Sequence, residues 1–123
     1  MKRLLLIICL LFTLVTQAQR TVAYTDKISI GHWNNMEEDW IWELPVYSEL
    51  AFTIQGNSVM VNDRAESTYK LLDLVAEETN FSMWTALDET NKACRFVINV
   101  VPPETISVMY DDVIYVYQIS YVD

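Results

Sequence analysis

The sequence has few of the residues on which most catalytic and metal sites depend. It contains 1 histidine, 2 cysteines and 2 glycines among 123 residues. Phosphate-binding loops need several glycines in a short span, and the common hydrolase and zinc-protease motifs need glycine or paired histidines. None of these motifs occurs, and transition-metal sites need more histidine or cysteine than the chain has. We therefore expect a protein without catalytic activity, metal or cofactor.

Basic residues are also scarce. The chain has 8 Lys and Arg against 17 Asp and Glu, and its formal net charge is −9 at pH 7. A surface of this charge repels the phosphate backbone of nucleic acids, so we expect no nucleic-acid partner. The same charge favours a basic protein partner, although acidic residues also serve simply to keep a small protein soluble. The acidic clusters, such as residues 37–39, lack the spacing of known calcium loops.

Long apolar runs are missing everywhere except near the N-terminus. There, two basic residues precede an apolar run from Leu4 to Val15, and small or polar residues lead on to Ala18. This order is typical of a secretory signal peptide that is cleaved after Ala18. The run is shorter than the roughly 20 residues of a spanning helix. We expect residues 1–18 to be removed and residues 19–123 to form one secreted or periplasmic domain, without membrane insertion.

Cysteine and histidine offer one nucleophile and one base. Cys9 lies in the expected signal peptide, so Cys94 has no partner for a disulfide in the mature domain. Cys94 alternates with apolar residues, which predicts a buried structural thiol. His32 continues the apolar face of its own segment, which predicts a core or rim histidine. The composition permits a nucleophile–base pair of Cys94 and His32. It also leaves carboxylate pairs of the glycosidase kind open, because their separation in space decides them and the sequence does not show it.

Short β-favouring runs separated by polar turns recur at intervals of about 8–12 residues, which is typical of an all-β sandwich or barrel. The expected strands cover residues 27–33, 40 or 46 to 54, 59–61, 67–75, 81–87, 94–101, 106–110 and 113–122. The turns between them are short, and short turns favour antiparallel neighbours.

The segment 64–78 fits two structures. Asp63 and Glu66 stand at the spacing of a helix capping box, and apolar residues fall on one helical stripe. Its neighbours, however, are expected to be strands joined by hairpins, which favours a strand here as well. A helix in this segment would make the fold α+β.

With a strand at 64–78, about eight sequential antiparallel strands most simply form a small up-and-down barrel, because closure removes the free edges. With a tryptophan on the first strand, and with Gly31 two places before Trp33, this order resembles the calycin class of barrels, to which lipocalins and avidins belong. The resemblance implies architecture only. A two-sheet β-sandwich is the alternative arrangement of the same strands.

Aromatic residues are the main candidates for a binding site. Trp40 and Trp42 alternate behind the acidic residues 37–39, and Pro45 ends the run. This pattern predicts a short edge strand or barrel-mouth segment whose tryptophans either close one end of the core or face a partner. In the last strand, residues 113, 115, 117, 119 and 121 are expected to share one face, where tyrosines either line a cavity or pack across strands. The candidate ligand-binding or partner-binding residues are Trp33, Trp40, Trp42, Tyr115 and Tyr117.

Binding is the class of function that these observations leave. We expect a secreted or periplasmic binding module, which takes either a small apolar ligand in the barrel or a protein partner through an aromatic patch near Trp40 and Trp42. The alternative is an inhibitor or immunity-type protein whose acidic surface blocks a basic enzyme, since electrostatic complementarity gives fast association.

Overall fold

The computed structural model describes residues 20–62 and 64–123, which form one antiparallel sheet of nine strands. The strands are β1 (Arg20–Asn34), β2 (Asp39–Trp42), β3 (Val46–Gln55), β4 (Ser58–Val61), β5 (Arg64–Glu77), β6 (Phe81–Leu87), β7 (Ala93–Asn99), β8 (Thr105–Met109) and β9 (Val113–Val122). No helix in these residues is long and apolar enough to cross a membrane. The expected signal peptide, residues 1–18, lies outside the described residues.

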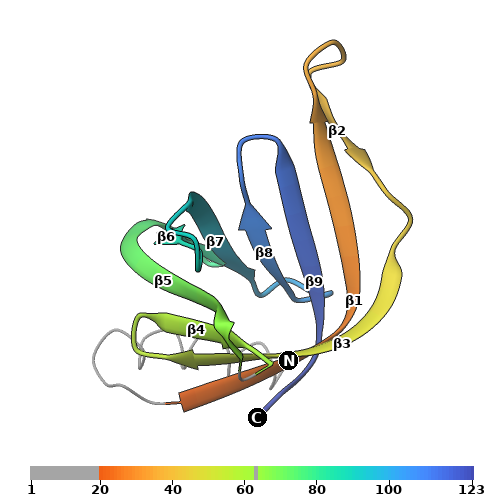
Figure 1. Cartoon of the computed structure of the whole chain (residues 1–123). Coiled ribbons are helices and arrows are strands. Elements are labelled where there is room, and N and C mark those ends of the chain that lie inside the picture. The colour runs from red at the N-terminus through yellow and green to blue at the C-terminus, as the bar shows by residue number, and fades with distance from the viewer. Residues whose placement is uncertain (1–19, 63) are drawn as a thin grey trace.

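Eight of the nine strands close into a barrel (Figure 1). From β3 to β9 each strand pairs with the next, and β1 pairs with β3 on one side and with β9 on the other. The closing ladder runs from Ala23 opposite Val122 to His32 opposite Val113. The predicted small antiparallel barrel is therefore confirmed. The sandwich and the α+β alternative are wrong, because the sheet closes on itself and the segment predicted at 64–78 is strand β5.

Strand β2 lies outside the closed barrel. It pairs with the upper part of β1, from Gly31 opposite Trp42 onward, and the β1–β2 hairpin projects beyond the end of the barrel (Figure 1). From Ile28 towards the N-terminus of β1, the same edge of β1 pairs with strand β3 instead. Pro45 lies between the two strands and cannot donate a backbone hydrogen bond, which explains why the edge is interrupted there. The predicted short edge strand is confirmed.

The core fills the middle of the barrel with alternating apolar side chains. Along β6, β7 and β8, every second residue is buried. The largest fully buried side chains are those of Phe52, Phe96, Ile106, Val59, Val100 and Val108. Burial of an apolar side chain of this size stabilises the fold by roughly 1.5–3 kcal/mol.

Strand β1 begins at Arg20, well before the start predicted at Lys27. Its inner positions in this early part are Thr21, Ala23 and Thr25, which are only 5%, 4% and 2% exposed. These side chains are small or polar, so the alternation of buried and exposed positions produces almost no alternation in hydrophobicity. The hydrophobic pattern of the sequence therefore does not indicate the part of β1 before Lys27, which the structure shows to be a strand.

The alternation predicted for the last strand is wrong beyond Ile119. Ile119 and Val122 are both buried, whereas Tyr121 is 57% exposed. The register between β9 and β1 shifts at this point, because Thr25 stands opposite Ile119 while Tyr24 stands opposite Tyr121. Such a β-bulge adds one residue to a strand and reverses the faces of the residues that follow.

Candidate functional site

A row of outward-facing residues crosses the upper part of the barrel. Residues that stand directly opposite one another in antiparallel strands share one face of the sheet. The outer row consists of Thr85, Arg95, Met109, Ile114, Gly31 and Trp42, each opposite the next. The neighbouring row, Trp84, Phe96, Val108, Tyr115 and Ile30, includes buried residues of the core cluster. The first row therefore lies on the outside of the barrel.

Three tryptophans lie on this outer face, and we call Trp33, Trp40 and Trp42 the tryptophan surface. Trp33 stands opposite Trp40, and their rings meet edge to face with centroids 5.4 Å apart. Trp33 is 38% exposed and Trp42 is 50% exposed. None of the three belongs to the core cluster. Of the two placements expected for Trp40 and Trp42, the structure shows the one outside the core.

Gly31 allows Trp42 to lie directly on the barrel wall. A Cβ atom at this position would lie 2.8 Å from Ile114 Cγ2 and 3.1 Å from Trp42 Cζ3. Carbon atoms in favourable contact are about 3.5–4.0 Å apart, so a methyl group does not fit without movement of its neighbours. Ile114 is only 8% exposed although it faces outward. The glycine thus makes room for the indole ring, of which half remains exposed.

A groove of about 500 Å³ adjoins the tryptophan surface. Trp33 and Trp40 contribute to its lining, together with Leu72, Thr85, Leu87, Arg95, Met109 and Asp111. Leu72 is 47% exposed, and Arg95 is held against the outer wall, with Nη1 3.9 Å from Met83 Sδ. The groove therefore continues the apolar surface that the tryptophans begin, with one cationic group inside it.

Acidic residues surround the β1–β2 hairpin. Residues 37–39 are exposed in and beside its turn. Just after β2, Glu43 lies beside His32, with Oε2 2.5 Å from Nε2, and both side chains are more than half exposed. An exposed pair of this kind adds only about 0.2–1 kcal/mol to stability. Its effect is to hold one carboxylate and the rim histidine together at the base of the hairpin.

Cys94 and His32 do not form a nucleophile–base pair. Cys94 is buried, and this burial together with the negative charge of Asp88 raises the pKa of its thiol to about 11, although a hydrogen bond with Tyr110 acts in the opposite direction. The thiol is therefore protonated at neutral pH and is a poor nucleophile. Within the described part of the chain, the hydrogen bond of the His32 ring goes to Glu43.

Tyr115 and Tyr117 lie on the inner face, apart from the tryptophans. Both stand opposite buried residues of β8. The Tyr117 ring meets Phe52 with centroids 4.8 Å apart, and the Tyr115 ring meets Tyr110 at 6.3 Å. Burial raises the pKa of Tyr117 to about 12, with a smaller contribution from Tyr115. These contacts are cross-strand packing inside the barrel.

The β6–β7 turn is organised by Asp88. Its Oδ1 accepts hydrogen bonds from the backbone N–H groups of Thr90 and Lys92, both at 2.9 Å, and its Oδ2 accepts one from the Tyr110 hydroxyl at 2.8 Å. Burial alone raises the pKa of Asp88. The hydrogen bond that the Thr90 hydroxyl donates to Oδ1 at 2.7 Å, together with the three just named, outweighs this effect and holds the pKa down at about 2. Residues 20–62 and 64–123 contain no group of three or more His, Cys, Asp or Glu placed to hold a metal ion.

The structure thus brings three of the five candidate residues together outside the barrel and places the other two inside. The sequence did not indicate that Met109, Ile114 and Arg95 lie beside the tryptophans. Their alternation gives the face on which they lie, but only the register of β7, β8 and β9 brings them next to β1. Comparison with protein-family models, with curated proteins and with solved structures found no match to this chain.

Proposed function

We propose that this protein is a non-catalytic binding protein that recognises a protein partner through the tryptophan surface. The observation that carries the proposal is the position of β2. The barrel closes through β1 and β9 without this strand, yet the outer face of the hairpin holds partly exposed indole rings. Tryptophan is enriched among the residues that dominate the energy of protein–protein binding. A strand that the barrel does not need for closure is free to serve recognition.

A protein partner is better supported than a small apolar ligand held in a lipocalin-like cavity. The barrel interior contains the packed rings of Phe52, Phe96 and Tyr117, and the first two of these residues are completely buried. A barrel of eight strands has an interior just wide enough to be filled by side chains or to hold one small ligand. The aromatic residues inside this barrel favour the filled arrangement.

The charge around the tryptophan surface favours a basic partner. Residues 37–39 and Glu43 place carboxylates along both ends of β2, and the chain as a whole is acidic. Charges at the rim of an interface mainly speed association and make it sensitive to salt. Inhibition of a basic enzyme is the narrower form of the same proposal, because an inhibitor of this kind uses the same exposed acids.

We place this binding outside the cytoplasm. The support is the order of residues 1–18, in which basic residues, an apolar run and a small residue at the cleavage position follow one another. Protein isolated from its native host then has the molecular mass of a chain that begins at Gln19. A molecular mass that still includes residues 1–18 contradicts export with cleavage.

The test compares single alanine variants of the tryptophan surface with a matched control. Wild-type protein captures partners from the exported fraction of its host, and the dissociation constant of each purified candidate is measured by calorimetry. We expect Trp42→Ala and Trp33→Ala each to weaken binding by about 30-fold, as for a central hot spot worth about 2 kcal/mol. The control is Tyr121→Ala, which removes an aromatic ring of similar exposure from the far end of β9.

Circular dichroism and thermal unfolding show whether each variant is folded. Folded Trp33→Ala and Trp42→Ala variants that bind every candidate as tightly as the wild type make the proposal wrong. Loss of binding in Tyr121→Ala to the same extent also contradicts it, because the effect is then not specific to the hairpin. For a basic partner, the association rate falls steeply as ionic strength rises.

A further inference from the structure

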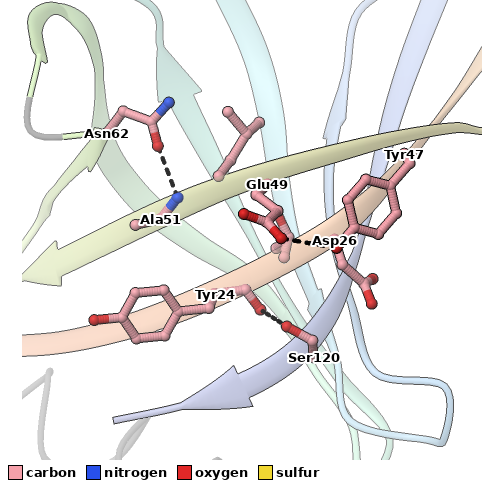
Figure 2. A pocket seen from close by; sticks show the side chains of 9 residues that line it. Tyr24, Asp26, Tyr47, Glu49, Ala51, Asn62 and Ser120 are labelled. Atoms are coloured by element: carbon pink, nitrogen blue, oxygen red, sulfur yellow. Dashed lines mark hydrogen bonds between the residues drawn. The ribbon is translucent and has the colours of Figure 1, made fainter.

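A second hollow lies on the outer face, lower down, where β1, β3 and β9 meet. Its volume is about 470 Å³. The residues that line it include Tyr24, Thr25 and Asp26 of β1, Tyr47 and Glu49 of β3, and Ser120 of β9 (Figure 2). It shares no lining residue with the groove beside the tryptophan surface. We call it the Asp26 pocket.

Asp26 interrupts the regular pairing of β1 on both sides. Against β3 and against β9 alike, the register jumps between Thr25 and Lys27, so Asp26 has no cross-strand partner. Irregularities of this kind re-aim side chains and are common beside functional sites. A charged side chain in the middle of a 15-residue strand is thereby placed at the wall of the pocket.

Among residues 20–62 and 64–123, the buried Asp26 Oδ1 atom has no hydrogen-bond partner. The adjacent Thr25 Oγ1 has none either, but Thr25 is only 2% exposed and its side chain lies on the inner face of β1. A buried polar atom without a partner destabilises the fold, and a charged one does so more strongly. Native proteins keep such atoms rarely, and an unseen water molecule or bound group is a common reason. The Asp26 carboxylate lines the pocket.

The rest of the pocket is acidic and aromatic. Glu49 adds a second carboxylate, and its Oε1 accepts a hydrogen bond from the Tyr47 hydroxyl at 2.7 Å (Figure 2). This hydrogen bond raises the pKa of Tyr47, the charge of Glu49 raises it further, and burial and the charge of Asp26 add smaller effects in the same direction. The neighbouring cation Lys27 is exposed, does not line the pocket and makes no ion pair with a described residue.

We propose that the Asp26 pocket binds an alkylammonium group, with the carboxylates of Asp26 and Glu49 as its acceptors. An ammonium group has three N–H donors and no acceptor, which matches a pocket whose described lining holds two carboxylates and no cationic side chain. The rings of Tyr24 and Tyr47 line the same space, and a cation near the face of a tyrosine ring is stabilised further. The alkyl chain of the ligand then runs outward along the rings.

This inference does not depend on the tryptophan surface, because the two sites share no residue. Two sources supply the same chemistry: a free primary amine, or a lysine side chain of a polypeptide. Each is represented by a soluble probe. The first probe is n-butylammonium chloride, and the second is N-acetyl-lysine methylamide, which carries the ammonium group on a peptide unit.

The experiment is a chemical-shift titration of the full mature protein, with sodium chloride adjusted to keep ionic strength constant. We expect n-butylammonium to bind with a dissociation constant of about 1 mM or lower, which corresponds to a weak single-site interaction. Neutral n-butanol is the control for apolar contacts alone and should bind at least about 10-fold more weakly. We expect Asp26→Asn and Glu49→Gln each to weaken n-butylammonium binding by at least about 10-fold.

The matched control is Asp73→Asn, which removes one exposed carboxylate from β5, away from the pocket. It should bind n-butylammonium as the wild type does. Glu49 is exposed, so Glu49→Gln keeps the test valid even if Asp26→Asn fails to fold. Tighter binding of the lysine derivative indicates a polypeptide source, and equal binding indicates a free amine. The proposal is overturned if n-butanol binds as well as n-butylammonium, or if folded Glu49→Gln binds as the wild type does.

Discussion

At Gly31, the absence of a side chain lets Trp42 rest against Ile114 on the barrel wall. The backbone of this glycine does not need positive φ, so its role is to leave space. At Gly56 the situation is the reverse. There φ is +60°, and no atom lies within 4 Å of an added Cβ, so the role of this glycine is conformational. The two glycines of the chain thus meet different physical requirements.

We predict that Gly31→Ala destabilises the protein by about 1–3 kcal/mol, because the new methyl group forces Ile114 and the Trp42 ring apart. Urea unfolding measures the loss, and tryptophan fluorescence reports the displaced ring. Gly56→Asn is the matched control, because asparagine tolerates the left-handed conformation, and it should change stability by less than about 1 kcal/mol. Equal stability of Gly31→Ala and the wild type contradicts the close contact.

The Asp26 pocket could not be predicted from the sequence. Asp26 lies between Thr25 and Lys27 in a stretch of polar residues, which resembles an ordinary turn. The position becomes unusual only in the sheet, because both neighbouring strands shift register beside it. The one signal in the sequence is that the apolar alternation of Ile28 and Ile30 does not continue backwards through Asp26.

At the scale of single elements, the contribution of the β1–β2 hairpin to stability can be measured directly by mutation. Its two strands meet through the pairs Gly31 with Trp42 and Trp33 with Trp40. Cross-strand aromatic pairs stabilise hairpins directly, and they do so on whichever face they occupy. The tryptophans therefore hold the hairpin together as well as forming its surface.

We predict a coupling free energy of about 0.5–1.5 kcal/mol between Trp33 and Trp40, because their rings meet edge to face at 5.4 Å. The measurement is a double-mutant cycle of Trp33→Ala, Trp40→Ala and the double variant, followed by urea unfolding. A parallel cycle of Trp33 and Tyr121, which do not stand on paired positions, should give a coupling below about 0.5 kcal/mol. Coupling of the same size in both cycles rules out a specific ring contact.

Most elements could be predicted from sequence because their inner residues are large and apolar. The alternation in β6, β7 and β8 matches the predicted ranges closely. Strand β1 could not be bounded, because Thr21, Ala23 and Thr25 occupy inner positions without a hydrophobic signal. The reversal of faces near Ser120 could not be predicted either, because a bulge is set by the partner strand.

At the scale of the whole molecule, the choice between barrel and sandwich depends on the pairing of β1 with β9. The residues involved lie at opposite ends of the sequence, and no local pattern indicates that they meet. The same long-range pairing decides that Trp33, Trp40 and Trp42 lie beside Met109 and Ile114. The alternation in the sequence therefore predicts on which face of its strand each aromatic residue lies. It does not predict which residues of other strands lie beside that aromatic residue.

We predict that the protein loses stability in alkaline solution from about pH 9 upward. The thiol of Cys94 has its pKa raised from 9.0 to about 11, and Tyr117 has its pKa raised from 10.0 to about 12. The folded chain keeps these protons at pH values where the unfolded chain has lost them, so stability falls as the pH rises through this range. The loss from these two groups should reach roughly 3–4 kcal/mol by pH 11.

Urea midpoints between pH 8 and pH 11 measure this loss. In Cys94→Ala the decline should begin about one pH unit later, because only the tyrosines remain, and burial also raises the pKa values of Tyr69 and Tyr110. A midpoint that stays constant up to pH 11 contradicts the burial of these groups. An unchanged onset in Cys94→Ala contradicts the role of the thiol.

The closing ladder between β1 and β9 also has a consequence for how the protein folds. Because Ala23 pairs with Val122 and His32 with Val113, the first strand gains its second neighbour only after the last strand is in place. Folds dominated by such distant contacts form slowly, on a scale of about milliseconds to seconds. During that time the edges of β1 and β8 stay open to pairing with other chains. We therefore expect a chain truncated before β9 to aggregate rather than to form a smaller barrel.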